Sequence, residues 1–191
     1  MLLYIKEEVD LHRERLLYDL ENAVFIHPTD TIYGLGCNAT DKKLVQKIRD
    51  VKKRQDQPFS IIAPSKRWIY QNCNVTRQGS QWVEKLPGPY TLILKLKNKS
   101  AIASNVNNDM PTLGVRIPKH WFSDVVYELG FPVVTTSANV TGEDFMTNID
   151  NLNNEIKHKI DFILYEGEKM ANPSQLIDLT REKISITRRK K

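Results

Sequence analysis

Short apolar runs alternate with amphipathic stretches along most of the chain. Runs rich in apolar and β-branched residues, which are typical of buried strands, occur at 2–5, 23–26, 59–63, 90–97, 112–118 and 132–136. The stretches between them have apolar residues at helical spacing, and residues 41–54 carry them at Leu44, Val45, Ile48 and Val51. Residues 121–130 follow the same spacing and end at Gly130, a residue type that commonly terminates helices.

The last part of the chain adds a polar helix and more strands. The helix is expected over about 149–159, and the strands over 162–167, 174–179 and 183–188. Strands that alternate with helices and then follow one another indicate an α/β fold. We therefore expect one domain, residues 1–191, built on a twisted, open, mixed sheet with flanking helices.

Composition and charge narrow the class of protein. The 28 basic and 23 acidic residues give a net charge of +5, which permits a nucleotide, polyphosphate or RNA partner without requiring one. Cys37 and Cys73 form no zinc pattern, and the four histidines lack partners at metal-ligand spacing, so no protein-bound metal is expected. No apolar run approaches the roughly 20 residues of a membrane helix, and the charged N-terminus is no secretion signal. We expect a cytoplasmic protein with no membrane partner.

The decapeptide "HPTDTIYGLG", residues 27–36, leaves a buried strand through small polar residues and glycines. One interpretation is a turn, because proline, aspartate and glycine favour turns. The other is the wall of a ligand pocket, with hydroxyl groups held at the end of the strand.

Two stretches place cations where an anion could bind. In "VKKRQDQPFS", Lys52 and Arg54 stand at a helix end, where they interact favourably with the helix dipole or face a bound anion. In "LGVRIP", strand alternation separates Leu113 and Val115 from Gly114 and Arg116. Arg116 then forms a structural salt bridge or binds a carboxylate or phosphate.

A further stretch, "PVVTTSANVTGE", carries hydroxyl and amide groups at the end of a buried strand. Open α/β sheets bind ligands at such strand ends, although a capped turn has the same composition. The chain contains no "GxxxxGK" or "GxGxxG" loop, no serine elbow and no Cys/His pair.

Taken together and in order, "PTDTIYGLG", "KKR…PFS", "PGPYTLIL", "GVRIP" and "TTSAN.TG" resemble the YrdC family of L-threonylcarbamoyladenylate synthases, over roughly residues 10 to 189. The resemblance implies a sheet around a large, basic, concave cavity. It also implies synthesis of threonylcarbamoyl-AMP and pyrophosphate from L-threonine, bicarbonate and ATP with Mg²⁺, a nucleotidyltransferase reaction that starts threonylcarbamoyladenosine modification of tRNA. In-line attack at phosphorus requires positioning and charge neutralisation more than a covalent nucleophile.

The resemblance also implies roles for individual residues. Thr31, Arg116 and Ser174 are expected to bind L-threonine, while Lys52 and Arg54 are expected to face the ATP phosphates as catalytic groups. The remaining expected ATP contacts are Thr112, Ser137, Asn139, Thr147 and Arg188. Because Arg188 has the strand parity of Ile184 and Ile186, which are expected to face the core, it is expected to turn in over the nucleotide, with residues 189–191 in water.

The sequence departs from the family pattern in three ways. The segment "QDQP" after Arg54 is one residue shorter than the common form, which leaves the pairing of Gln57 open. Ile61 or Ile62 stands near the position where some members have a histidine, and the additional C-terminal domain of longer members is not part of this sequence.

Two other functions are alternatives to the synthase. One is a non-catalytic factor for double-stranded RNA or tRNA binding or for ribosome maturation, and the other is a paralogue that binds a different carboxylate and nucleotide. A binding module needs only a basic surface, whereas the synthase also needs Thr31, Arg116 and Ser174, which are present. Besides its substrates, the synthase is expected to meet the tRNA threonylcarbamoyl-transfer machinery and, as an open possibility, RNA itself.

Overall fold

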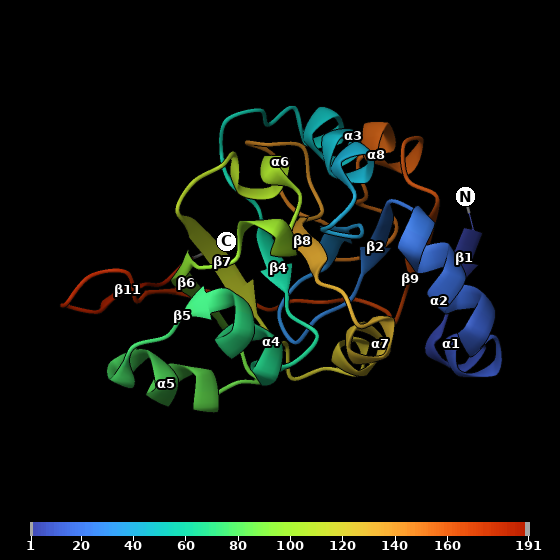
Figure 1. The fold of residues 1–191 in the computed structure, drawn as a ribbon. Helices are drawn as coiled ribbons and strands as arrows, with labels where there is room; N and C mark the ends of the chain where they lie inside the picture. Colours follow the sequence, from blue (N-terminus) through green and yellow to red (C-terminus); the bar gives the residue numbers. More distant parts are fainter. Residues whose placement is uncertain (1, 190–191) are drawn as a thin grey trace.

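The computed structural model describes residues 2–189 (Figure 1). Along the chain the elements are β1 (Leu2–Tyr4), α1 (Lys6–Leu11), α2 (Arg13–Asn22), β2 (Phe25–His27), β3 (Gly34–Gly36), α3 (Lys42–Lys52), β4 (Ser60–Ile62), α4 (Lys66–Asn72), β5 (Cys73–Asn74), α5 (Arg77–Glu84), β6 (Tyr90–Leu96), η1 (Lys99–Ala101), α6 (Ser104–Asn107), β7 (Thr112–Arg116), α7 (Phe122–Leu129), β8 (Val133–Ser137), α8 (Asn154–Lys157), β9 (Phe162–Leu164), β10 (Gln175–Asp178) and β11 (Ser185–Thr187).

Within residues 2–189, eleven strands form one mixed sheet with the order β1-β9-β2-β3-β8-β4-β7-β6-β10-β11, and β5 pairs with β6. The pairs β1/β9, β2/β9, β4/β7 and β6/β10 are parallel, and the others are antiparallel. The expected mixed α/β sheet with flanking helices is confirmed.

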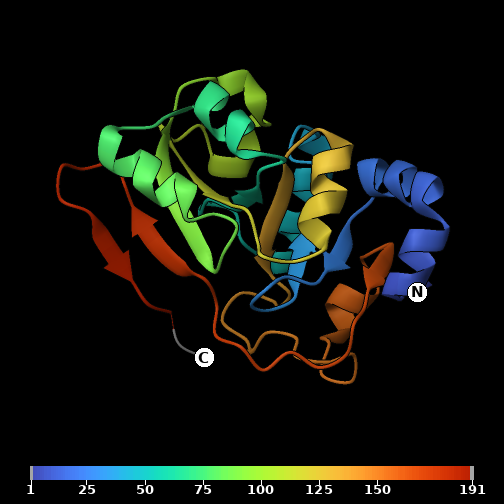
Figure 2. The same ribbon diagram turned by 90° about the horizontal axis from the view of Figure 1, so that it is seen from below.

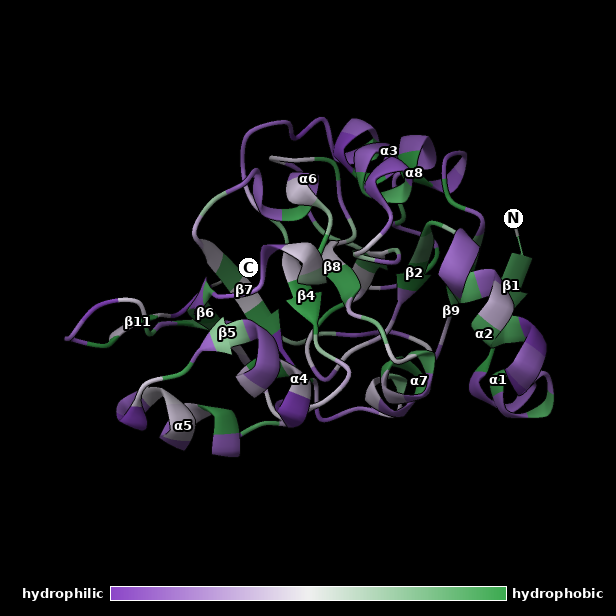
Figure 3. Ribbon diagram, in the orientation of Figure 1, coloured by the Kyte–Doolittle hydropathy of each residue, from purple (hydrophilic) through white to green (hydrophobic). Residues whose placement is uncertain are grey.

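The two faces of the sheet bury two hydrophobic clusters. The larger cluster joins the sheet to α3, α4, α5, α6 and α8, and the smaller one joins it to α1, α2 and α7. Leu113 and Val115 of β7 belong to the larger cluster, as the alternation predicted. Figure 3 shows the consequence for the whole molecule, with hydrophobic residues in central strands such as β4 and hydrophilic residues on helices such as α3.

Helix α3 begins and ends where the sequence indicates. The Asp41 side chain accepts hydrogen bonds from the backbone N–H groups of Lys43 and Leu44, so Asp41 caps the start of the helix. The helix ends at Lys52, and the next residue, Lys53, adopts a left-handed conformation with φ of 51°. This change of direction starts the loop that contains Arg54.

Strand β3 was not expected, because its sequence, Gly-Leu-Gly, has no strand pattern. The strand forms through pairing with β2 and β8. A Cβ atom on Gly34 would lie 2.7 Å from the His27 ring, and one on Gly36 would lie 2.9 Å from it. Both glycines are therefore required because the His27 ring lies across β3.

Other local differences involve short elements. The polar helix expected over 149–159 is limited to α8, because Asn148 and Asn151 form side-chain turns before it. The two-residue strand β5 and the four-residue helix α6 were not expected. Elements this short depend on their neighbours rather than on a sequence pattern.

The segment between β9 and β10 runs from one edge region of the sheet, where β9 lies next to β1, to the other, where β10 lies next to β11 (Figure 2). Its Glu166 carboxylate accepts hydrogen bonds from His120 and Trp121 and forms an ion pair with Lys169. Burial alone would raise the pKa of Glu166, but the hydrogen bonds from these three residues outweigh it and lower the pKa to about 2. The Tyr33 hydroxyl accepts a hydrogen bond from the Glu166 amide at 3.1 Å. These contacts fix the course of the segment that carries Ser174.

Candidate active site

A cavity of about 490 Å³ lies on the sheet face that carries Gly34, Ser60, Arg116, Thr135 and Ser137. The register explains how these residues meet, because Ser60 pairs with Thr135 and Gly34 pairs with Ser137 on neighbouring strands. Side chains at paired positions point to the same face of a sheet. The decapeptide thus contributes a pocket wall, and its glycines also serve internal packing.

Three arginines from distant parts of the chain line this cavity: Arg54, Arg116 and Arg189. Burial is the main cause that lowers the pKa of each, and repulsion from Arg189 lowers the pKa of Arg54 and Arg116 further. Within residues 2–189, only Arg116 of the three forms an ion pair. The exposed carboxylates of Glu143 and Asp144 also line the cavity. The site therefore favours an anionic ligand.

Arg116 combines both interpretations that the sequence left open. Its Nη2 donates to Asp30 at 2.6 Å and to the Thr31 hydroxyl at 3.3 Å. The second carboxylate oxygen of Asp30 accepts the Lys119 amide at 2.9 Å. The Nε of Arg116 is buried and has no hydrogen-bond partner within residues 2–189. The salt bridge therefore holds one side of the guanidinium and leaves donor capacity for a ligand.

The two threonine hydroxyls near Arg116 differ in their remaining capacity to form hydrogen bonds. The Thr29 hydroxyl donates to the Ile32 carbonyl at 2.8 Å and accepts from the Thr31 amide at 3.1 Å. Its only proton is thus used, so the 3.0 Å contact between the two hydroxyls has Thr31 as donor. Thr29 lines the cavity but is saturated, whereas Thr31, expected to bind L-threonine, is buried behind the lining and keeps one lone pair after accepting from Arg116.

Lys52 does not face the cavity, contrary to expectation. Its ammonium is buried and donates to the carbonyls of Ser137 and Asn139 at 2.6 and 2.7 Å and to the Asn139 side-chain oxygen at 2.9 Å. An ammonium has three donors, so none remains for a phosphate. Burial, and then repulsion from Arg54, lowers the pKa of Lys52 to about 7. In this structure Lys52 supports the wall that Ser137 lines, and Asn139 lies behind that wall.

Ser174 lines the cavity as expected and is held from two sides. Its hydroxyl makes a 2.7 Å hydrogen bond with the Thr91 hydroxyl and accepts one from Arg189 at 2.7 Å. The Nε of Arg189 also donates to the Ser174 carbonyl at 3.0 Å.

The expectation for Arg188 is wrong by one residue. Arg189, which has the parity of Ser185 and Thr187, lines the cavity and contacts Ser174, whereas Arg188, which has the parity of Ile184 and Ile186, is exposed and does not line it. Ile184 does pack against the larger cluster, but Ile186 is 51% exposed. Residues 190 and 191, which were expected in water together with Arg189, lie outside the described residues.

Two further expected ATP contacts lie away from the lining. Thr112 shares the face of Gly114 and Arg116 but stands at the opposite end of β7, and it does not line the cavity. Thr147 accepts a hydrogen bond from Asn151 at 2.8 Å and is not part of the lining. Among the positions at which the sequence departs from the family pattern, Ile61 and Ile62 are buried in the core. The Gln57 carbonyl accepts a hydrogen bond from Arg49.

Sequence reasoning missed three residues of this region: Thr91, Arg189 and Arg49. Thr91 and Arg189 required the register of β6, β10 and β11, which local patterns do not give. Arg49 is a charged residue at the helical spacing of the apolar positions of α3, on the buried side that also holds Lys52, and this was a signal that could have found it.

Comparison with known proteins places this architecture in a family. The family model Sua5_yciO_yrdC, described as "Telomere recombination", matches residues 20–190, nearly the whole chain. The chain belongs to this family.

Several relatives in the Sua5/YciO/YrdC family are similar to this member. A putative threonylcarbamoyl-AMP synthase of Methanocaldococcus jannaschii is 34% identical over 169 residues, which cover 86% of this chain and 78% of the relative. The structure of Pyrococcus abyssi Sua5 with L-threonine has a TM-score of 0.81 and 25% identity, covering 97% of this chain and 56% of Sua5. Escherichia coli YciO shares the fold, with 21% identity and a TM-score of 0.79. The match covers 99% of this chain and 94% of YciO. The chain thus spans about half the length of Sua5 and nearly all of YciO.

Residues 2–189 lack two further kinds of structural feature. No helix in this range has the length and apolar character needed to cross a membrane. No group of three or more His, Cys, Asp or Glu side chains in this range is arranged to hold a metal ion.

Proposed function

We propose that this family member is an L-threonylcarbamoyladenylate synthase, a nucleotidyltransferase. The observation that carries the proposal is the convergence of Arg54, Arg116 and Arg189 on one cavity, with hydroxyl groups between them. Relatives named threonylcarbamoyl-AMP synthase support it, and so does the similar fold of a Sua5 structure that contains L-threonine.

The proposed reaction divides the cavity into two parts. Near Asp30, Arg116 binds the carboxylate of L-threonine, with Thr31 and Ser174 closing this side. Near the loop after α3, Arg54 and Arg189 face the phosphates of ATP, which enters with Mg²⁺ as part of the substrate. Both groups of contacts lie in a partly buried cavity, where interactions between charges are stronger than in bulk water.

The chemistry proceeds by two bond-forming steps. The amino nitrogen of L-threonine attacks the carbon of bicarbonate, and water is lost as the carbamate forms. A carbamate oxygen then attacks the α-phosphorus of ATP, and the bond to the leaving pyrophosphate breaks. The arginines lower the cost of negative charge on the phosphates, and no covalent enzyme intermediate is needed. We also propose that the product passes to the tRNA threonylcarbamoyl-transfer machinery. A cytoplasmic location is part of the same proposal.

The direct test is pyrophosphate release from purified protein with MgATP, bicarbonate and L-threonine. We expect release that requires both bicarbonate and L-threonine, because the nucleophile is their carbamate. Equal release with L-serine or without an amino acid contradicts the proposal. RNA binding without this release would instead favour the non-catalytic alternative.

A further inference from the structure

Arg49 is a buried cation outside the cavity. Its side chain lies on α3, and the residue is 2% exposed. Within residues 2–189, no carboxylate lies at ion-pair distance from it. Its guanidinium instead donates to five backbone carbonyls, those of Asn105 at 2.7 Å, Arg54 at 3.0 Å, Gln55 at 2.8 Å, Gln57 at 3.2 Å and Val106 at 3.3 Å.

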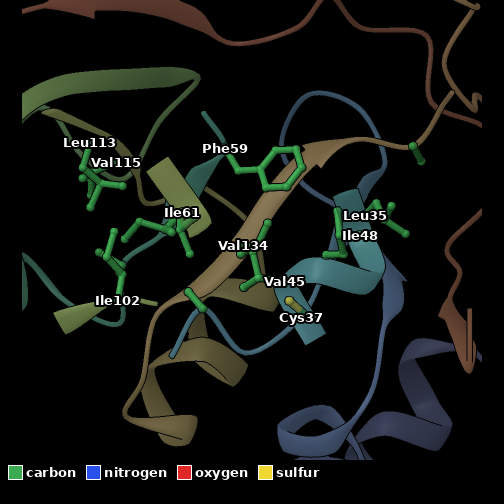
Figure 4. Packing of buried hydrophobic residues seen from close by; sticks show 14 of the residues in the cluster. Leu35, Cys37, Val45, Ile48, Phe59, Ile61, Ile102, Leu113, Val115 and Val134 are labelled. Atoms are coloured by element: carbon green, nitrogen blue, oxygen red, sulfur yellow. The ribbon is translucent and has the colours of Figure 1, made fainter. Parts of the chain in front are cut away.

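These carbonyls belong to two separate segments, the loop after α3 and the helix α6. Arg49 therefore ties the loop to α6. A second contact strengthens the connection, because the Phe59 amide donates to the Val106 carbonyl at 2.8 Å. The Phe59 ring also lies 4.6 Å from the Arg49 guanidinium carbon. Figure 4 shows Phe59 in the same buried cluster as Ile48 and Ile61.

The loop held in this way forms one wall of the cavity. Arg54, Pro58, Phe59 and Ser60 all line it. Arg54 is held within the loop, since its Nη2 donates to the Pro58 carbonyl at 2.9 Å. The course of the loop thus decides where the Arg54 charge lies. This loop is the segment that is shorter than the family's common form.

The positive charge of Arg49 has an electrostatic cost for Arg54. Burial lowers the pKa of Arg54, and repulsion from Arg49 lowers it further. A buried apolar side chain in place of Arg49 would remove that repulsion, but it could not donate to carbonyls in two segments. Five N–H donors in a rigid plane suit this task, and lysine has only three donors at one point.

We propose that Arg49 is a positioning residue that shapes the nucleotide-facing wall of the cavity by fixing the loop that carries Arg54. The effect on catalysis rests on the proposed function, whereas the effect on the loop does not. Replacement of Arg49 should therefore weaken the use of MgATP and leave the use of L-threonine almost unchanged.

The test compares Arg49→Met with Ile48→Ala, a control on the same helix that perturbs the buried cluster without touching the loop. We expect Arg49→Met to raise the KM for MgATP about tenfold and that for L-threonine less than about twofold. Ile48→Ala should lower the melting temperature without this selectivity. Equal changes for both substrates, or the same pattern in Ile48→Ala, overturn the proposal.

A double variant tests whether Arg49 acts through Arg54. In an Arg54→Ala background, Arg49→Met should raise the KM for MgATP by less than about twofold, because the positioned group is already gone. A full tenfold rise in that background overturns the proposed route.

Hydrogen exchange separates this inference from the proposed function. Arg49→Met should accelerate amide exchange at residues 54–59, including the Phe59 amide, while amides of β6 stay protected. Unchanged exchange at 54–59 overturns the positioning role whatever the activity. Failure of the wild type to release pyrophosphate contradicts the proposed function, while accelerated exchange would still establish the role of Arg49 in the loop.

Discussion

At the scale of single residues, Arg116 has two tasks in one guanidinium. Asp30 holds one nitrogen at 2.6 Å, and the buried Nε has no partner within residues 2–189. Arg116→Lys keeps the charge but loses the planar fork. We expect the affinity for L-threonine to fall by about 1.5–3 kcal/mol, the scale of a charge-assisted hydrogen bond, with little change for ATP. Titration calorimetry with each ligand measures both.

A matched control is available for this substitution. Arg13 also forms an ion pair between distant segments, since its Nε at 2.9 Å and its Nη2 at 2.7 Å donate to Glu128 and join α2 to α7. Arg13→Lys should leave L-threonine affinity unchanged. If Arg116→Lys weakens both ligands equally, or only destabilises the fold, Arg116 is a structural ion-pair partner and no ligand fork.

Lys52 gives a prediction about stability and pH. Burial lowers its pKa from 10.5 in the unfolded chain to about 7 in the fold. Between these values the unfolded chain binds more protons, so the contribution of Lys52 to stability is complete above the upper pKa and is lost as pH falls through the lower one. We expect the unfolding free energy of the wild type, relative to Lys52→Met, to increase as pH rises from 7 to 10.

Urea denaturation of both proteins over this pH range measures the difference. Groups that titrate in both proteins cancel when the two curves are subtracted. A difference that stays constant, or that decreases as pH rises, would show that Lys52 remains charged in the fold.

At the scale of elements, β11 turns one of two neighbouring arginines into the cavity. Arg189 lines the cavity and contacts both the carbonyl and the hydroxyl of Ser174, whereas Arg188 does not line it. We expect Arg189→Ala to raise the KM for ATP about tenfold and to lower turnover. Steady-state kinetics should show Arg188→Ala close to the wild type, which makes it a control of equal charge at the neighbouring position after β11. The reverse ranking of the two variants contradicts the orientation of β11.

At the scale of the whole molecule, sequence patterns correctly predicted those features that depend on residues close together in the chain, such as the two faces of a strand and the buried side of a helix. The alternation of β7 placed Leu113 and Arg116 on opposite faces, and the periodicity of α3 identified its buried side. Local patterns could not predict β3, whose Gly-Leu-Gly sequence forms a strand only between β2 and β8.

The sequence predicted which segments of the chain form the candidate site better than it predicted which side chains point into it. The expectations for Arg116 and Ser174 put them on the cavity, and both line it, although their roles remain predictions. Lys52 and Arg188 were misplaced for different reasons. The orientation of Lys52 depends on three oxygens that lie far along the chain, and that of Arg188 depends on which face of the sheet is hollow.

The crossing segment between β9 and β10 gives the cavity an order of assembly during protein synthesis. Thr29 and Arg116 leave the ribosome before Ser174 and Arg189, because chains are made from the N-terminus at about 5–20 residues per second. A nascent chain that ends before β10 can already contain the Arg116–Asp30 pair, yet the side of the cavity formed by Ser174 is absent. Under the proposed function, a substrate contacts both sides of the cavity only on chains whose translation has passed β11.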